Sequence, residues 1–225
     1  MDGLLRRDAL LARLSRSDPR IVVLVAPAGF GKTTLALQYL KERGGGALVD
    51  LDQVSGELDL ARRLIEALSR AGGEPGRFAA VERALGDAGS SVADRLALTL
   101  EAWRAASAAC VVFERAEYAL GIAPVRKFFG RLLGARGAER TVVICSRDPL
   151  RAQLPRHILP HELVTLRAVE LAFARDEIGT IFAGVVKDEA LLDRVAERTR
   201  GWPLAVFALR RLAGDGRLGA MLERF

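Results

Sequence analysis

The sequence predicts an α/β fold of three layers, in which helices cover both faces of a parallel sheet of about five strands. As far as residue 168, short apolar runs alternate with helical patterns, and beyond it the pattern is helical throughout. Because strands that alternate with helices pair in parallel through right-handed crossovers, both faces of their sheet are covered. We therefore expect one domain over residues 1–168 and a small helical subdomain over residues 169–225.

The predicted strands are short runs of apolar, mostly β-branched residues, a pattern typical of strands buried on both faces of a sheet. They cover residues 21–25, 47–51, 110–113, 141–145 and 163–166.

Predicted helices occupy the intervals between these strands, where apolar residues recur at helical spacing. A leading helix runs from Leu4 to Ser17 and stops at Asp18-Pro19, and the helix over 33–41 ends at the glycines 44–46. The other long helices cover 58–68, 92–108, 125–133, 176–182, 188–198 and 203–212, with loops around a short helix over 74–90.

The composition is that of a globular protein, because half of the residues are apolar and 28% are charged. A length of 225 residues suits one α/β domain with a helical appendage. The N-terminus lacks the basic-then-apolar order of a secretory signal, and no apolar run is long enough to cross a bilayer. We therefore expect a cytoplasmic protein with no membrane partner.

Cysteine and histidine are scarce. Cys110 and Cys145 adjoin β-branched runs and have no cluster of Cys or His nearby, so we expect buried free thiols in a reducing compartment. His157 and His161 are four residues apart, but Pro160 disrupts a shared helix face. A metal-binding histidine pair is therefore not expected.

The formal net charge of +6 suits either nucleic acid or an acidic ligand. The arginines, however, alternate with Asp and Glu at helix-surface spacing and form no sustained basic stripe. This distribution favours a solvated surface over a nucleic-acid interface. Among 34 basic residues only Lys32, Lys41, Lys127 and Lys187 are lysines, so the lysine at position 32 is informative.

A glycine-bearing turn joins the first predicted strand to the helix that follows it. The turn reads Ala26-Pro27-Ala28-Gly29-Phe30-Gly31-Lys32-Thr33-Thr34, which is the P-loop pattern with alanine in place of its first glycine. Its glycines let consecutive backbone N–H groups point at phosphate oxygens, and the helix N-terminus adds partial positive charge. The chain is therefore predicted to be a P-loop NTPase sandwich.

The last three residues of this loop have expected roles in binding ATP or ADP with Mg²⁺. Lys32 is expected to reach the β and γ phosphates, Thr33 to place its hydroxyl on Mg²⁺, and Thr34 to lie near the α phosphate. The loop residues expected to bind the nucleotide are Ala28, Gly29, Phe30, Gly31, Lys32, Thr33 and Thr34. The alternative is a glycine-rich turn that binds no ligand.

The third predicted strand ends in an acid, Glu114. Mg²⁺ bound to a nucleoside triphosphate needs a carboxylate at the end of a neighbouring strand, and hydrolysis needs a base. Glu114 is the candidate for the Mg²⁺-side carboxylate and for the catalytic carboxylate, with a solvated strand-end charge as the alternative. The next residue, Arg115, cannot act as a base at neutral pH. Glu117 can substitute only if the turn brings it back, so we expect slow hydrolysis or none.

The fourth predicted strand ends in the polar sequence Ser146-Arg147-Asp148-Pro149. Ligands of open α/β folds bind at the carboxyl edge of the sheet, where this segment is expected to lie. Arg147 is therefore a candidate to reach the γ phosphate and report its presence. A surface salt bridge is the alternative interpretation of Arg147.

Three segments in order, the P-loop, the strand that ends in 146–149 and the later Thr199-Arg200-Gly201-Trp202-Pro203, carry a family resemblance. Together they resemble the STAND class of signal-transduction ATPases, over nearly the whole chain to about residue 212. The nearest branch resembles the nucleotide-binding domain of large bacterial transcriptional activators of the maltose-regulon activator type.

The resemblance implies a regulatory switch in which bound ADP holds a closed monomer and ATP with an inducer permits oligomerisation. It also implies protein partners or self-association through the nucleotide-binding domain, and contact with DNA only through a segment outside this chain. Gly201, Trp202 and Pro203 are placed near the adenine by the resemblance. Alternatively, Trp202 and Pro203 simply begin and bury a helix.

Two departures from that family bear on function. Paired acids are usual where this chain has Glu114-Arg115, and too few residues follow Leu212 to form the family's sensor repeats and DNA-binding segment. We therefore expect an excised domain or a short protein that acts through partners. The rival hypotheses are an active NTPase or small-molecule kinase, with 147–156 as a weak lid candidate, and a degenerate P-loop module that binds no nucleotide.

Overall fold

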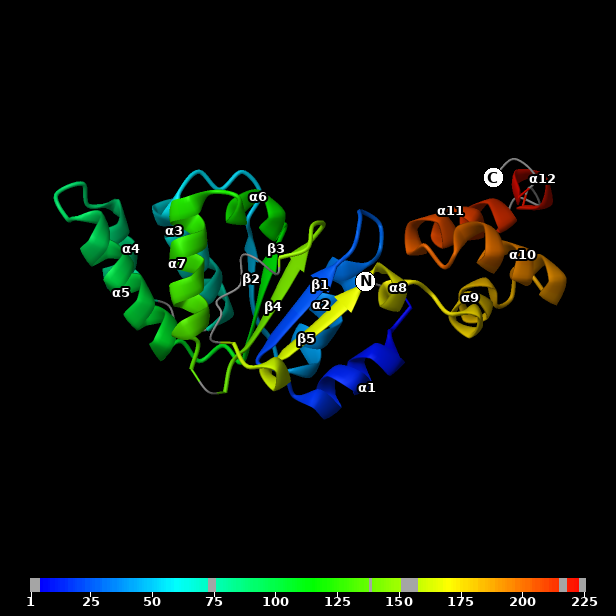
Figure 1. The fold of residues 1–225 in the computed structure, drawn as a ribbon, viewed down its shortest axis with the longest axis horizontal. Coiled ribbons are helices and arrows are strands. Elements are labelled where there is room, and N and C mark those ends of the chain that lie inside the picture. The colour runs from blue at the N-terminus through cyan, green and yellow to red at the C-terminus, as the bar shows by residue number, and fades with distance from the viewer. Residues whose placement is uncertain (1–4, 73–75, 138, 151–157, 215–217, 223–225) are drawn as a thin grey trace.

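The computed structural model describes residues 5–72, 76–137, 139–150, 158–214 and 218–222, and its architecture is an α/β sandwich with further helices at one end (Figure 1). The strands are β1 (Ile21–Val25), β2 (Gly46–Asp50), β3 (Cys110–Glu114), β4 (Thr141–Ser146) and β5 (Leu163–Arg167). The helices of the sandwich are α1 (Asp8–Ser17), α2 (Lys32–Glu42), α3 (Glu57–Ala71), α4 (Ala79–Gly86), α5 (Val92–Ala105), α6 (Ala116–Leu120), α7 (Ala123–Gly134) and α8 (Ala168–Leu171). A 3₁₀ turn, η1 (Pro160–Glu162), precedes β5.

The five strands form one parallel sheet in the order β2-β3-β4-β1-β5, which confirms the predicted fold class. All five strands were predicted to within one residue at each end. Strand β4 separates β1 from β3, with Leu24 opposite Cys145 and Phe113 opposite Ile144. The carboxyl ends of β1, β4 and β3 therefore lie next to one another at a single edge of the sheet.

Helices cover both faces of this sheet, and alternate strand residues divide between two apolar clusters. On one face, Ile21, Val23 and Phe113 join a cluster with α3, α5 and α7. On the other, Val22 and Leu24 join a cluster with α1 and α2. Because successive strand residues point to opposite faces, uniformly apolar strands such as β1 are the ones that a three-layer arrangement requires.

Most predicted helices differ from the structure by one or two residues at an end, and three differ by three or more. The helix predicted over 58–68 continues to Ala71. The leading helix begins at Asp8, not at Leu4, because the backbone N–H of Arg7 bonds the side chain of Gln38 and Leu5 packs against another apolar cluster. Leu4 itself lies outside the described residues. The helix that begins at Val92 ends at Ala105, because the chain turns into an extended conformation at Ala106 to enter β3. Helices α6 and α8 were not predicted.

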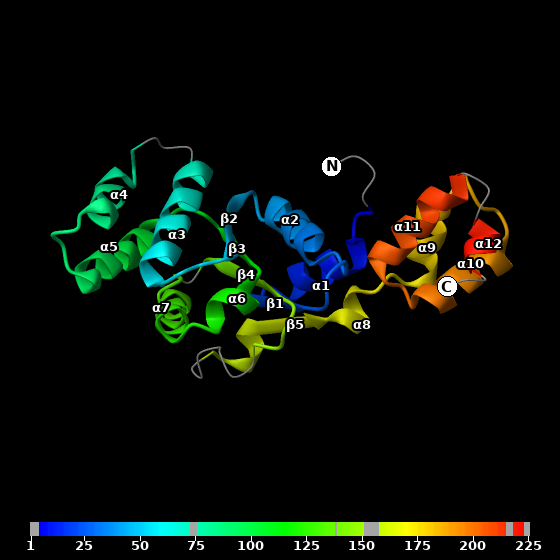
Figure 2. The same ribbon diagram turned by 90° about the horizontal axis from the view of Figure 1, so that it is seen from above.

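Four helices at the C-terminal side form an apolar cluster of their own. They are α9 (Arg175–Phe182), α10 (Glu189–Thr199), α11 (Pro203–Gly214) and α12 (Leu218–Leu222), and we call them the C-terminal helices. Their cluster includes Ile178, Phe182, Val195 and Val206. Figures 1 and 2 show these helices at the end of the molecule that is opposite α4 and α5. Of the helices in the described part of the chain, none has the length and apolar character needed to span a membrane.

Removal of the Phe129 ring tests the core on the α7 face. This side chain is fully buried, and its ring meets that of Phe113 edge to face at a centroid distance of 4.9 Å. We expect Phe129→Ala to lower the free energy of unfolding by about 3–5 kcal/mol, because a cavity replaces the ring. The measurement is chemical denaturation. Leu98→Ala, at a side chain that is 40% exposed, is the control and should change stability by no more than about 0.5 kcal/mol. Equal losses in the two variants would contradict this assignment of the core.

Candidate functional site

The loop between β1 and α2 leaves the sheet at Ala26, whose N–H bonds the carbonyl of Ser146 on β4. Gly29 and Gly31 both have left-handed backbone, with φ of 79° and 74°. Within the described part of the chain, the N–H groups of Gly29, Phe30 and Gly31 donate no hydrogen bond. This loop therefore has the glycine-dependent shape and the available donors that bind phosphate at a helix N-terminus.

The ammonium group of Lys32 lies against its own loop. Its Nζ donates hydrogen bonds to the carbonyl oxygens of Ala26, at 2.6 Å, and Pro27, at 2.9 Å. Burial lowers the pKa of Lys32, while the negative charges of Glu114 and Glu117 oppose that shift. To bind an anion in the pocket, the Lys32 ammonium group must therefore give up its hydrogen bonds to the carbonyls of Ala26 and Pro27.

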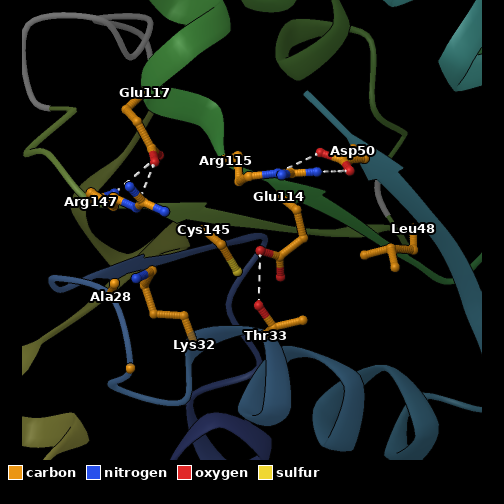
Figure 3. Close-up of a pocket in the computed structure, with 11 residues that line it drawn as sticks. Ala28, Lys32, Thr33, Leu48, Asp50, Glu114, Arg115, Glu117, Cys145 and Arg147 are labelled. Carbon is orange, nitrogen blue, oxygen red and sulfur yellow. Dashed lines mark hydrogen bonds and ion pairs between the residues drawn. The ribbon is translucent and has the colours of Figure 1, made fainter. Parts of the chain in front are cut away.

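Strand β3 ends at Glu114, whose side chain meets Thr33 at the start of α2 (Figure 3). Thr33 Oγ1 donates a hydrogen bond of 3.1 Å to Glu114 Oε2. The other oxygen, Oε1, is buried and has no hydrogen-bond partner among the residues that the structure describes. A buried carboxylate oxygen without a partner, next to a hydroxyl, suits a hard divalent cation such as Mg²⁺.

Arg115 turns away from Glu114 and toward β2 (Figure 3). It adopts left-handed backbone, with φ of 58°, and its guanidinium pairs with the carboxylates of Asp50 and Asp52. Burial raises the pKa of Asp50, but the hydrogen bonds from Arg115 and from the backbone N–H of Asp52, together with the nearby positive charges, outweigh burial and hold that pKa below its ordinary value. Arg115 is therefore engaged with the neighbouring strand.

The turn at Arg115 starts helix α6, and α6 brings Glu117 back to the same edge of the sheet. The side chain of Glu117 is only 7% exposed, and its Oε2 accepts the backbone N–H of Arg147 at 3.0 Å. The guanidinium Nε of Arg147 lies 3.5 Å from Glu117 Oε1. Arg147 also approaches the hydroxyl and the ring of Tyr118. Arg147 therefore forms an ion pair and also lines the pocket, and its contact with a γ phosphate stays a prediction.

These side chains line a cavity of about 420 Å³, within the usual range of about 300–1,000 Å³ for ligand pockets. Its lining residues are Ala28, Gly29, Lys32, Thr33, Leu48, Asp50, Glu114, Arg115, Glu117, Cys145 and Arg147. Positive and negative groups thus converge around one open space, with the P-loop on one side of it and the ends of β3 and β4 on the other (Figure 3).

A second, much smaller hollow lies on the other side of the loop. It has a volume of about 30 Å³, which is room for about one water molecule. Leu5, Arg7, Gly31, Thr34, Phe173, Pro203 and Phe207 line it. Pro203, which the resemblance to STAND ATPases places near the adenine, therefore lies beside Gly31 and Thr34, but the space between them is too small for a purine ring.

Helix α11 begins directly on the P-loop. The N–H of Leu204 donates to the carbonyl of Gly29 at 3.1 Å, and Trp202 Nε1 donates to the carbonyl of Ala28 at 3.2 Å. The Trp202 ring stacks on Phe30 at a centroid distance of 6.5 Å. The C-terminal helices and the phosphate-binding loop are therefore joined by one main-chain hydrogen bond and by one from the Trp202 side chain.

Sequence analysis missed Arg7, which connects three parts of the chain. Its buried guanidinium donates to the carbonyls of Leu171 and Ala172 and to the carboxylate of Glu177 on α9, and it lies over the Phe173 ring. The signal in the sequence was weak, because Arg7 is one arginine among many. Its role depends on contacts with residues more than 160 positions away.

The structure thus distributes the predicted site residues over two neighbouring places. Ala28, Gly29, Lys32, Thr33, Glu114 and Arg147 line the larger cavity, whereas Gly31, Thr34 and Pro203 line the smaller hollow. Phe30 contacts Trp202. His157 and the segment 151–156 of the weak lid candidate lie outside the described residues. Among the residues that the structure describes, no three or more His, Cys, Asp or Glu side chains are grouped so that they could hold a metal ion.

No model of a protein family matches this chain, and no curated protein sequence matches it either. Solved structures do resemble it. A Walker-type ATPase of Pyrococcus abyssi is 14% identical with a TM-score of 0.63, and the match covers 98% of this chain and 71% of that one. Drosophila ORC bound to DNA is 18% identical with a TM-score of 0.60, covering 93% of this chain and 60% of that one.

A third similar structure is AMPPCP-bound DnaA from Aquifex aeolicus, which is 14% identical with a TM-score of 0.52. The match covers 96% of this chain and 64% of the DnaA chain. The chain thus spans somewhat less than two thirds of the ORC and DnaA chains. At these identities the likeness concerns the fold, which is that of P-loop ATPases.

The two cysteines should be unreactive in the native protein. Burial raises the pKa of Cys110 to about 12, and burial together with the charge of Glu114 raises that of Cys145 far above its ordinary value. Thiolate is the reactive form, so we expect no reaction with a disulfide reagent at pH 8 and reaction of both thiols in guanidinium chloride. Rapid labelling of either thiol in the native state would contradict the burial described above.

Proposed function

We propose that this chain is an ATP- or ADP-binding switch domain, of the STAND type, that hydrolyses ATP slowly or not at all. The observation that carries the proposal is the contact between helix α11 and the P-loop. Because the same loop residues bind phosphate in the proposal and bond α11 in the structure, nucleotide and the C-terminal helices act on one segment.

The larger cavity supplies the groups that a triphosphate needs. Lys32 is proposed to leave the carbonyls of its loop for the β and γ phosphates, and Thr34 to lie near the α phosphate. Thr33 and Glu114 are proposed to hold Mg²⁺, which supplies positive charge against the phosphate oxygens when bound. Arg147 is proposed to contact the γ phosphate, because its exposed guanidinium lines the same cavity.

The smaller hollow supports a base-binding position that opens when the C-terminal helices move. Pro203 and Phe207 on α11 form one wall, and Gly31 and Thr34 form another. A purine can enter only if these walls separate, which would also strain the bonds from Trp202 and Leu204 to the loop. Nucleotide binding is therefore expected to change how α11 sits on the P-loop.

Slow hydrolysis is part of the proposal because Arg115 is paired with Asp50 and Asp52 and cannot accept a proton, so the position directly after Glu114 supplies no base. The proposed switch acts through protein partners or self-association, and it reaches DNA only through segments beyond this chain. The AMPPCP-bound state of the DnaA neighbour supports the nucleotide class. The transcriptional role depends on the sequence resemblance to STAND regulators.

Nucleotide should stabilise the protein against heat. At a hundredfold excess over the dissociation constant, binding to the native state adds about 2.7 kcal/mol to the free energy of unfolding. Lys32→Ala should remove most of this gain, because the phosphates lose their ammonium partner. The measurement is the melting temperature with and without millimolar ADP or ATP and Mg²⁺.

The matched control is Lys41→Ala, at an exposed lysine on the same helix, which should keep the full gain. If added nucleotide changes neither the melting temperature of the wild type nor that of Lys32→Ala, the proposed function is wrong.

Trp202 should report the movement of α11. Of the two tryptophans, Trp103 is fully buried and bonded to the Leu132 carbonyl, so Trp103→Phe leaves Trp202 as the single tryptophan, which can be excited selectively over the two tyrosines. We expect its emission to change on titration with nucleotide, because its bond to Ala28 and its contact with Phe30 are disturbed. An unchanged spectrum, in a sample that calorimetry shows to be saturated with nucleotide, would argue against coupling.

A further inference from the structure

Glu117 is a buried acid in the cavity, and one of its oxygens has no hydrogen bond. Its side chain is 7% exposed, and Oε1 accepts no hydrogen bond in the part of the chain that the structure describes. We propose that Glu117 is the catalytic base that takes the proton of the attacking water, in place of an acid at position 115. This inference rests on the proposed binding of ATP in the same cavity.

The backbone after β3 fixes where Glu117 points. Arg115 takes left-handed backbone, so helix α6 starts immediately after it and Glu117 falls in its first turn. Ala116, Ala119 and Leu120 are fully buried in the cluster beneath the sheet face, which holds this short helix in one orientation. Glu117 is then the residue of α6 that lines the cavity (Figure 3).

The two acids of the cavity have different partners, and this difference assigns them different roles. Glu114 Oε2 is bonded to Thr33 at the proposed Mg²⁺ position. Glu117 lies on the opposite side of Cys145, next to Arg147, the proposed γ-phosphate contact (Figure 3). A base for hydrolysis must stand beside the γ phosphate and not at the cation, and Glu117 meets that requirement.

The contact with Arg147 also explains how the carboxylate becomes available. The guanidinium lies 3.5 Å from Oε1, a longer separation than a direct hydrogen bond, and the Arg147 side chain is 49% exposed. A phosphate group in the cavity competes with Glu117 for this guanidinium. When Arg147 turns to the phosphate, Oε2 keeps the backbone N–H of Arg147, and Oε1 is free to accept a proton.

The proposed reaction is hydrolysis of the terminal phosphoanhydride bond. The water oxygen forms a bond to the γ phosphorus as the bond from that phosphorus to the β–γ bridging oxygen breaks. One proton of the water passes to Glu117, which later releases it to solvent, and ADP and inorganic phosphate leave. No oxidant or reductant is required.

The competing explanation is that Glu117 only positions Arg147. Under that explanation, Glu117→Gln adds no further loss once Arg147 has been replaced by alanine. If Glu117 is the base, Glu117→Gln lowers the rate in the Arg147→Ala protein as well as in the wild type. The comparison of the two single variants with the double variant therefore separates the two roles.

The experiment measures three quantities on the whole chain with Mg²⁺. They are the affinity for ADP and ATP by calorimetry, the melting temperature without nucleotide, and the single-turnover rate of phosphate release from labelled ATP. The variants are Glu117→Gln, Arg147→Ala, their combination, Glu114→Gln and Lys32→Ala. The control is Glu82→Gln, an exposed acid in the first turn of another short helix, α4.

We expect Glu117→Gln to bind ADP and ATP within about threefold of the wild type and to keep its melting temperature, because glutamine still accepts the Arg147 N–H. Its turnover should fall by about 100-fold or more in both backgrounds, the usual contribution of a general base. Glu114→Gln should instead weaken binding in the presence of Mg²⁺, and Glu82→Gln should change none of the three quantities.

Several results would overturn this role. They are turnover by Glu117→Gln within about twofold of the wild type, no further loss in the Arg147→Ala protein, or a wild type that binds ATP without releasing more phosphate than Lys32→Ala. The last result leaves nucleotide binding intact. Absence of ADP and ATP binding to the wild type in calorimetry would instead reject the proposed function itself, so the two failures are distinguishable.

Discussion

The left-handed backbone at Gly29 is the constraint on which the site depends. At this residue the loop bends over the end of β1, and helix α11 approaches it so closely that an added Cβ would lie 2.7 Å from Leu204 Cβ. Only glycine satisfies both the backbone angle and the close approach. The shape of the phosphate-binding loop and the docking of the C-terminal helices are thus determined at one position.

Around this bend, each basic side chain of the cavity has a partner within the protein. Lys32 bonds two carbonyls of its own loop, Arg115 pairs with Asp50 and Asp52, and Arg147 meets Glu117. Of these, Lys32 and Arg147 have partners that a phosphate group can replace, whereas Arg115 is bound to the adjacent strand. The charge available to a polyphosphate therefore comes from two sides of the cavity.

The sequence was sufficient to predict the sheet, because β1, β3 and β4 are apolar on both faces, and β3 and β4 end in the polar residues Glu114 and Ser146. It was also sufficient for the P-loop, whose chemistry lies within nine consecutive residues. It could not place Glu117, because that depends on a left-handed turn at Arg115, a conformation that arginine rarely adopts. The sequence could not predict the contacts of Arg7 for another reason, because its partners are distant in sequence and the residues next to it form no motif.

The pairing of Arg115 also concerns the edge of the sheet. Within the described part of the chain, strand β2 has a neighbour only on its β3 side. Arg115 ties the end of β3 to Asp50 at the end of β2 and to Asp52 just beyond it. An acid at this position would face those two aspartates and repel them. A residue at position 115 can therefore either hold β2 through an ion pair or accept a proton, but not both. Because Arg115 holds β2, the proposed base for hydrolysis is at another position.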